Sequence, residues 1–224
     1  MSLRYIGTGD TIVTCPYTRD YDGYWDLVNW IKTADVRFSN MENPLVDGEC
    51  PAGQFSGNPW MRAPSTLLDE MADFDFNLYG FANNHALDYH YEGLLQTLKA
   101  FKDRNLPVAG AGHDLAEATK HIKVDTPKGS VALVALTTTI DPSAIAGPPR
   151  GNILGRPGVS LLRHKAEYYV TEEQLKQLEE IAEVTEYSGG RVMLNTIFSG
   201  GKRRGELTAK AYKVRSAGGS EQNA

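Results

Sequence analysis

The chain has 224 residues, of which 41% are hydrophobic and 23% are charged, a composition typical of a globular protein with one large domain or two small ones. Its formal net charge of -5 argues against nucleic acid as a main partner, because phosphate binding requires a basic surface. No run approaches the roughly 20 apolar residues of a membrane-spanning helix. Residues 1–4 lead directly into a predicted strand, so we expect no secretory signal, and the cellular location stays open.

Strand and helix signals alternate along the first half of the chain. Apolar residues recur at helical spacing in some segments, and short apolar or alternating runs between them predict strands. In chain order, the sequence predicts a strand at 4–9, a helix at 24–31, a strand at 35–40, a loop at 44–64, a short helix at 66–72 capped by Ser65, a strand at 74–81, a helix at 91–104 and a strand at 107–110. This β-α-β order favours a layered α/β fold with an at least partly parallel sheet.

The second half has weaker signals. In order, the sequence predicts a β-hairpin at 121–136, an extended loop at 141–157, an amphipathic helix at 172–186, a strand at 191–198 and a polar, flexible tail at 199–224. The hairpin prediction depends on Pro127 and Gly129, which favour a turn. We therefore predict one α/β domain over residues 1–198, followed by the tail.

Three polar clusters follow predicted strands: Gly9-Asp10, Asn40-Met41-Glu42 and Asn83-Asn84-His85. In α/β sheets, ligands usually bind at the carboxyl ends of the strands. Carboxylate, amide and imidazole groups suit divalent Mn, Mg, Fe or Zn, and a metal pair can activate water and bind a phosphoryl-type group. No cluster is specific by itself, because each of them also suits a turn, a helix cap or an exposed loop.

Taken in order, these motifs resemble the signature of the CapA family, which is named for poly-γ-glutamate capsule synthesis and resembles calcineurin-like metallophosphoesterases. The resemblance covers residues 4–136 and is carried by Thr8-Gly9-Asp10, residues 39–45, residues 82–89, Glu92-Gly93-Leu94 and Gly110-Ala111-Gly112, with a later element at 155–158. It implies a layered metallophosphoesterase-like sandwich.

The resemblance also implies roles for individual side chains. The implied metal ligands are Asp10, Glu42 and Asn84, the implied catalytic pair is His85 and Asp88, and the implied substrate-binding residues are Asn40 and Asn83. Asp88 would orient His85, since catalytic histidines commonly need a fixed tautomer. The substrate would be phosphorylated, polyanionic or peptide-like.

The chain also departs from the family pattern. The family usually supplies further histidines in its second half, whereas only His164 follows His121 here. We therefore expect an incomplete metal site and a sandwich that lacks much of its C-terminal half. Half a sandwich would expose an apolar face, which we expect a second copy, the 172–186 helix or further segments to cover.

Two classes of function stay open. The first is a metal-dependent hydrolase or transferase that acts on a phosphorylated or polyanionic peptide substrate. The second is a non-catalytic or metal-free protein that binds polyglutamate or an assembly partner, or that performs acid–base chemistry on a peptide with carboxylates and His85 alone.

Overall fold

The computed structural model describes residues 2–15, 17–54, 59–138, 141–163, 168–174, 176–177 and 212–214. The chain divides into two units, Met1–Arg163 and His164–Ala224, and each is described by itself. All of the predicted site residues belong to the first unit. No helix in the described ranges has the length and apolar character needed to cross a membrane.

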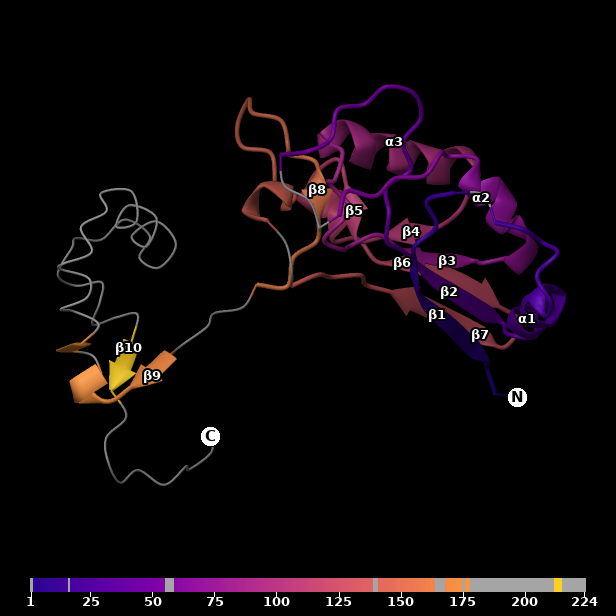
Figure 1. Cartoon of the computed structure of the whole chain (residues 1–224), viewed down its shortest axis with the longest axis horizontal. Coiled ribbons are helices and arrows are strands. Elements are labelled where there is room, and N and C mark those ends of the chain that lie inside the picture. The colour runs from indigo at the N-terminus through magenta and orange to yellow at the C-terminus, as the bar shows by residue number, and fades with distance from the viewer. Residues whose placement is uncertain are drawn as a thin grey trace. The chain divides into compact units, whose positions relative to one another are not determined.

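Four parallel strands form the central sheet of the first unit, in the order β1-β2-β3-β4 (Figure 1). The strands are β1 (Tyr5–Thr11), β2 (Val36–Met41), β3 (Leu78–Gly80) and β4 (Val108–Ala109). Helical crossovers join consecutive strands, so all four carboxyl ends meet at one edge of the sheet. The predicted α/β class and parallel sheet are confirmed.

Three helices connect these strands: α1 (Tyr24–Lys32), α2 (Leu67–Glu70), which continues as the 3-10 helix η1 (Met71–Phe74), and α3 (His90–Asp103). Their apolar faces and one face of the sheet form a single core. Leu94 and Phe101 of α3 are fully buried in this core together with Met41 and Tyr79 from the strands. Complete burial of side chains of this size stabilises the fold by roughly 1.5–3 kcal/mol each.

Strand residues that do not belong to this helical core are also buried. Val36 and Leu78 lie outside the helical core cluster, yet they are only 0% and 1% exposed.

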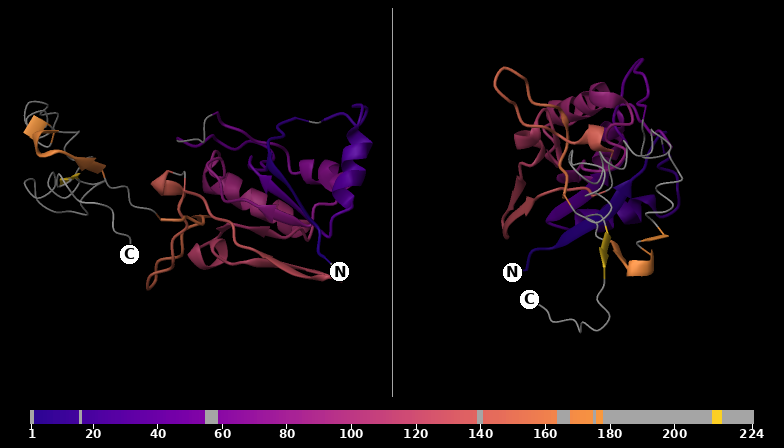
Figure 2. Two further views of the ribbon diagram at one scale, coloured as in Figure 1. Left: turned by 90° about the horizontal axis from the view of Figure 1, so that it is seen from below. Right: turned by 90° about the vertical axis from the view of Figure 1, so that its left-hand side faces the viewer.

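The predicted hairpin forms from two antiparallel strands, β6 (Ile122–Thr126) and β7 (Gly129–Leu133), and it runs beside the sheet (Figure 2). Strand β1 is one edge of the sheet, and its Tyr5 is 51% exposed. The expected covering of an apolar sheet face by a second copy, by the 172–186 helix or by further segments stays a prediction.

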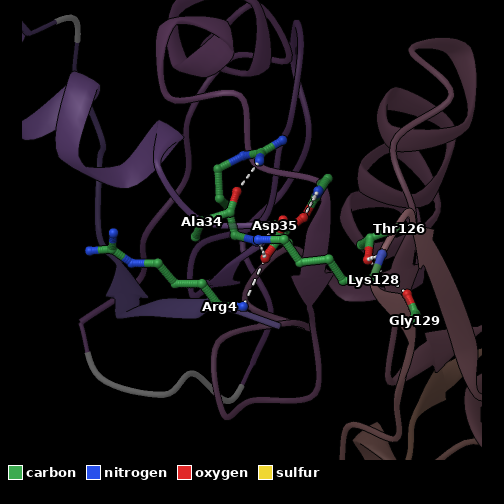
Figure 3. Close-up of polar contacts among 8 residues, drawn as sticks. Arg4, Ala34, Asp35, Thr126, Lys128 and Gly129 are labelled. Atoms are coloured by element: carbon green, nitrogen blue, oxygen red, sulfur yellow. Dashed lines mark hydrogen bonds and ion pairs between the residues drawn. The ribbon is translucent and has the colours of Figure 1, made fainter. Parts of the chain in front are cut away.

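Asp35 fixes the tip of the hairpin to the amino-terminal end of the sheet (Figure 3). Its Oδ2 atom accepts hydrogen bonds from the backbone N–H of Arg4 (2.8 Å) and from Lys128 Nζ (2.9 Å). These bonds, that from Arg4 above all, lower the pKa of Asp35. The contact between Lys128 and Asp35 joins residues that lie 93 positions apart in the sequence.

Some local predictions were wrong. The strand predicted at 74–81 shortens to β3, because residues 71–74 form η1 and Asp75 then adopts a positive φ of 52°. The helix predicted to be capped by Ser65 begins at Leu67 after Thr66, and no side chain caps it. Four short elements of the first unit were not predicted: β5 (Ala111–Gly112), α4 (Leu115–Ala118), the 3-10 helix η2 (Pro142–Ala144) and β8 (Gly158–Val159), which pairs with β5. Elements this short carry no usable periodicity.

In the second unit, β9 (Tyr168–Val170) and β10 (Tyr212–Val214) pair in parallel, and residues 172–174 and 176–177 are helical. The remainder of the predicted 172–186 helix and the predicted strand at 191–198 lie outside the described residues. So does the predicted domain boundary at residue 198, which stays a prediction.

Candidate functional site

The predicted site residues begin with a row that crosses the sheet at its carboxyl edge. Asp10 of β1 is in register with Asn40 of β2, Asn40 with Gly80 of β3, and Gly80 with Ala109 of β4. Glu42 follows β2 directly, and its backbone N–H still bonds to the end of β1. Parallel pairing therefore places the polar ends of β1 and β2 side by side.

The amide of Asn40 joins two carboxylates. Its Nδ2 atom donates to Asp10 Oδ1 (2.8 Å) and to Glu42 Oε2 (2.7 Å), which uses both amide hydrogens. The two carboxylate oxygens consequently lie within the span of two hydrogen bonds. This geometry gives Asn40 a positioning role, and its predicted contact with substrate stays a prediction.

Glu42 is a buried acid with negative neighbours. It is 7% exposed, and burial raises its pKa, with a further rise from the charge of Asp10. The nearby His85 and the hydrogen bond from Asn40 oppose this rise. Among the described residues no lysine or arginine forms an ion pair with Glu42. The neighbouring carboxylates of Asp10 and Glu42 are thus electrostatically suited to a cation.

The loop after β3 carries the second part of the site. Asn83 is buried, and its Nδ2 donates to the backbone carbonyl of Met41 (2.7 Å). The backbone N–H of His85 in turn donates to Asn83 Oδ1 (3.0 Å). Asn83 therefore connects the end of β2 to His85, while its predicted role in substrate binding stays a prediction. Asn84 lies half-buried in the same loop, and its role as a metal ligand is likewise untested.

His85 and Asp88 are in contact. His85 Nδ1 lies 2.8 Å from Asp88 Oδ2, and the Asp88 residue is fully buried. An ionised carboxylate only accepts hydrogen bonds, so this contact requires the hydrogen on Nδ1, and Nε2 is the ring nitrogen that Asp88 does not contact. The structure places Asp88 where it orients His85, and the catalytic role of the pair stays a prediction.

Asp88 also holds the 44–64 loop, a function that the sequence analysis missed. Its Oδ2 accepts a hydrogen bond from the backbone N–H of Met61 (2.8 Å). Its backbone carbonyl accepts a second hydrogen bond, from the backbone N–H of Gly53 (2.6 Å). The same loop is fixed near its start by Thr97 Oγ1, which accepts from the backbone N–H of Leu45 (2.8 Å). These partners lie far apart in the sequence, so no local pattern signals them.

Asn43 is a further polar residue to which sequence reasoning gave no role. It is fully buried beside Glu42, and its Oδ1 accepts from the backbone N–H of Val13 (3.1 Å). Its Nδ2 has no hydrogen-bond partner among the described atoms. The hydrogen bond from Val13 to Asn43 fixes the chain that leaves β1 to the chain that leaves β2.

The donor set determines which metal these residues fit. Within the described ranges, no three histidine, cysteine, aspartate or glutamate side chains are grouped to hold a metal ion. Asp10 and Glu42 nevertheless present closely spaced carboxylates, and Asn84 would add an amide oxygen. Such an oxygen set fits Mg²⁺ or Mn²⁺ better than structural Zn²⁺, with water completing the coordination.

The raised pKa of Glu42 makes a testable prediction about stability. A carboxyl group whose pKa is raised on folding binds its proton more tightly in the folded state. The stability that it contributes is complete below its ordinary pKa of 4.5 and is lost as the pH rises through the folded pKa. We therefore expect Glu42→Gln to stabilise the metal-free protein at pH 7.5 by about 0.5–2 kcal/mol, and to have little effect near pH 4.

Thermal unfolding at both pH values measures this effect. Glu49→Gln changes the same group at an exposed position and serves as the control, with no expected gain. A Glu42→Gln variant that is less stable than wild type at pH 7.5, or equally stabilised at both pH values, would contradict the prediction.

Comparisons with known proteins bear on this arrangement. The family model described as "Bacterial capsule synthesis protein PGA_cap" matches residues 6–194. An uncharacterised protein of Sinorhizobium fredii is 31% identical over 181 residues, which are 79% of this chain and 39% of that protein. The PGA biosynthesis protein CapA of Bacillus subtilis is 37% identical over 107 residues, which are 47% of this chain and 28% of that protein.

The capsule biosynthesis protein CapA of Bacillus anthracis is 26% identical over 134 residues, which are 59% of this chain and 33% of that protein. The chain thus covers less than half the length of each of these relatives. The family match extends from the strand that carries Asp10 through the loop that carries His85 and beyond. The chain therefore belongs to the PGA_cap family of bacterial capsule synthesis proteins, which is part of the metallophosphoesterase-like superfamily.

Proposed function

We propose that this capsule-synthesis chain carries a metallophosphoesterase-type site for metal-assisted hydrolysis or transfer on a phosphorylated or polyanionic peptide substrate. The observation that carries the proposal is the carboxylate pair Asp10 and Glu42, held by Asn40 at the sheet edge where the His85–Asp88 pair follows the adjacent strand. The names of the Bacillus relatives support the link to capsule polymer.

Asp10 and Glu42, with Asn84, would hold the metal. When bound, a divalent ion supplies Lewis acidity toward a phosphoryl or carbonyl oxygen and lowers the pKa of a bound water. The chain's own contribution is to keep two hard oxygen donors together through Asn40. The pKa of Glu42 is raised by its burial and then by the charge of Asp10, and the cation would offset both effects.

His85 would exchange a proton or hydrogen bond with the reacting group through Nε2. Asp88 holds Nδ1 at 2.8 Å and keeps the imidazole in one orientation. Asn83 fixes the backbone of His85 relative to the end of β2, so the ring keeps a constant position relative to the carboxylates. A positioned general acid or base of this kind typically contributes 10²–10⁴-fold to a rate, by order of magnitude.

The second candidate function needs no metal. Burial raises the pKa of Glu42, and the negative charge of Asp10 raises it further. Glu42 also interacts electrostatically with His85. A carboxyl group of this kind keeps its proton to a higher pH than an exposed glutamate does, which suits it to proton exchange with a substrate. Acid–base chemistry on a peptide, or simple binding of polyglutamate or of an assembly partner, is the resulting alternative.

Titration calorimetry with Mn²⁺ tests the metal proposal. We expect weak binding to wild type, and a loss of about tenfold or more in affinity in Asp10→Ala and Glu42→Ala, because each removes one of few charged donors. Asp22→Ala removes an exposed carboxylate elsewhere and is the control. Tight, stoichiometric binding that survives both substitutions would exclude Asp10 and Glu42 as ligands.

Hydrolysis of a generic phosphodiester in the presence of Mn²⁺ tests catalysis. Any metal-dependent turnover should fall by about 10²–10⁴-fold in His85→Ala, while Mn²⁺ affinity is retained. No Mn²⁺ binding together with measurable binding of polyglutamate would instead favour the second candidate function.

A further inference from the structure

One segment of the chain differs in charge from the rest. The chain carries a formal net charge of -5, yet no aspartate or glutamate occurs between Asp141 and Glu167. Within that segment stand Arg150, Arg156 and Arg163. All three arginines are exposed. The segment is therefore a basic region in an acidic protein.

The structure places this region at the carboxyl edge of the sheet. Strand β8 pairs with β5, next to the end of β4 (Figure 1), and the backbone N–H of Ser160 donates to the carbonyl of Gly110 (2.8 Å). Tyr91 Oη, at the start of α3, donates to the carbonyl of Ser143 (3.2 Å). The basic segment consequently flanks the loop that carries His85.

A fourth arginine lies in contact with the same loop. Arg62 follows Met61, whose backbone bonds to Asp88, and its guanidinium lies 5.4 Å from the centre of the Tyr89 ring. Arg62 is exposed. One exposed arginine therefore contacts the loop between β3 and α3 directly.

Besides Arg4 at the amino-terminal end of the sheet, the arginines in the described ranges fall into two groups. Arg19, Arg37 and Arg104 each form an ion pair with an aspartate. By contrast, none of four exposed arginines forms an ion pair with any described carboxylate: Arg62, and Arg150, Arg156 and Arg163 of the basic segment. Two of them donate to backbone carbonyls instead, Arg156 Nε to Ile145 (2.9 Å) and Arg62 Nη1 to Gly48 (3.4 Å), so their positive charges have no carboxylate partner among the described residues.

The hairpin that carries Arg150 also exposes apolar side chains. Arg150 pairs with Ile153 across the turn, and Ile153 and Leu154 are 67% and 88% exposed. A partner with both carboxylates and methylene groups would satisfy this mixture of charge and apolar surface better than a small inorganic anion would.

We propose that Arg62, Arg150, Arg156 and Arg163, here named the arginine surface, bind a linear polycarboxylate of the polyglutamate type and direct it toward the His85 loop. The proposal rests on the proposed function, since it assigns that site a polyanionic, peptide-like substrate. Guanidinium groups bind carboxylates bidentately, and spaced arginines match the repeated charges of such a chain.

Fluorescence anisotropy with a labelled poly-γ-glutamate oligomer tests the proposal, using the full chain in EDTA. We expect the double variant Arg150→Gln/Arg163→Gln to bind roughly three- to tenfold more weakly than wild type, because each exposed ion pair is worth a few tenths of a kcal/mol to one. Arg150→Lys keeps the charge but not the bidentate geometry, so its affinity for the oligomer should lie between those of wild type and the double variant. Wild-type binding should weaken as salt increases.

Arg4→Gln is the matched control, because Arg4 is an exposed arginine at the opposite, amino-terminal edge of the sheet. We expect it to bind like wild type. Equal losses in Arg4→Gln and in the double variant, or no binding of the oligomer by wild type, would overturn the proposal. Binding to phosphatidylglycerol vesicles without binding to the oligomer would also overturn it, in favour of a lipid partner that contacts Leu154.

The same assay with His85→Ala separates this proposal from the proposed function. The variant should bind the oligomer like wild type even where all hydrolysis is lost. A protein that hydrolyses phosphodiesters yet does not bind the oligomer would contradict the arginine surface alone. A protein that binds the oligomer through these arginines but has no metal-dependent activity would contradict only the catalytic proposal.

Discussion

Replacing Asp88 by alanine is expected to lower the free energy of unfolding by about 3 kcal/mol and to release the imidazole of His85 from a single tautomer. The Asp88 residue is fully buried, and its Oδ2 contacts both His85 Nδ1 and the backbone N–H of Met61 at 2.8 Å. Removal of the carboxylate leaves both partners without this acceptor in a buried environment, where each unsatisfied group costs about 1–3 kcal/mol.

Denaturant unfolding measures the first effect, and nitrogen NMR shifts of the His85 ring measure the second. The ring signals should indicate an Nδ1–H tautomer in wild type and a mixture in Asp88→Ala. Asp88→Asn keeps one acceptor oxygen and should have smaller effects on both quantities. The tautomer reading separates an orienting role from a purely structural one, which would change stability alone.

Asp103→Ala is the control for loss of an aspartate from an ion pair. Asp103 pairs with Lys99, and both side chains are more than half exposed. Its loss should cost no more than about 0.5 kcal/mol. A similar cost for Asp88→Ala, with an unchanged His85 tautomer, would show that Asp88 neither holds the 44–64 loop nor orients the ring.

A second large effect is expected from Gly110→Ala, which should destabilise the protein by about 3 kcal/mol. Gly110 has a φ of +101°, and an added Cβ would lie 2.6 Å from Ala82 Cβ and 2.9 Å from Ala82 N. Both the backbone conformation and the overlap oppose a side chain here. Because Ala82 precedes Asn83, relief of the overlap should also displace the loop that carries His85.

Gly48→Ala isolates the backbone contribution, because Gly48 has a φ of +67° and no atom lies within 4 Å of an added Cβ. We expect this control to cost about 1 kcal/mol. Urea unfolding of both variants gives the comparison, and Mn²⁺ titration of Gly110→Ala reports on the site. Equal costs for the two variants would contradict the close packing of Gly110 on the His85 loop.

The sequence by itself determined those features that depend on neighbouring residues. The helices α1 and α3, the strands β1, β2 and β4, and the β6–β7 hairpin follow from apolar periodicity and turn residues within short windows. The order of the polar motifs indicated one site at one sheet edge, because each crossover returns the chain to that edge. The same motifs indicated the family.

Only the tertiary structure decided how these side chains contact one another. Asn40 reaches Asp10 across 30 positions, Asn83 reaches the carbonyl of Met41 across 42, and Met61 reaches Asp88 across 27. Contacts of this range depend on strand register and on which polar groups the core leaves without water, and neither is encoded in a local pattern. The raised pKa of Glu42 has the same origin, since burial and the charge of Asp10 act on it only once β1 and β2 are paired.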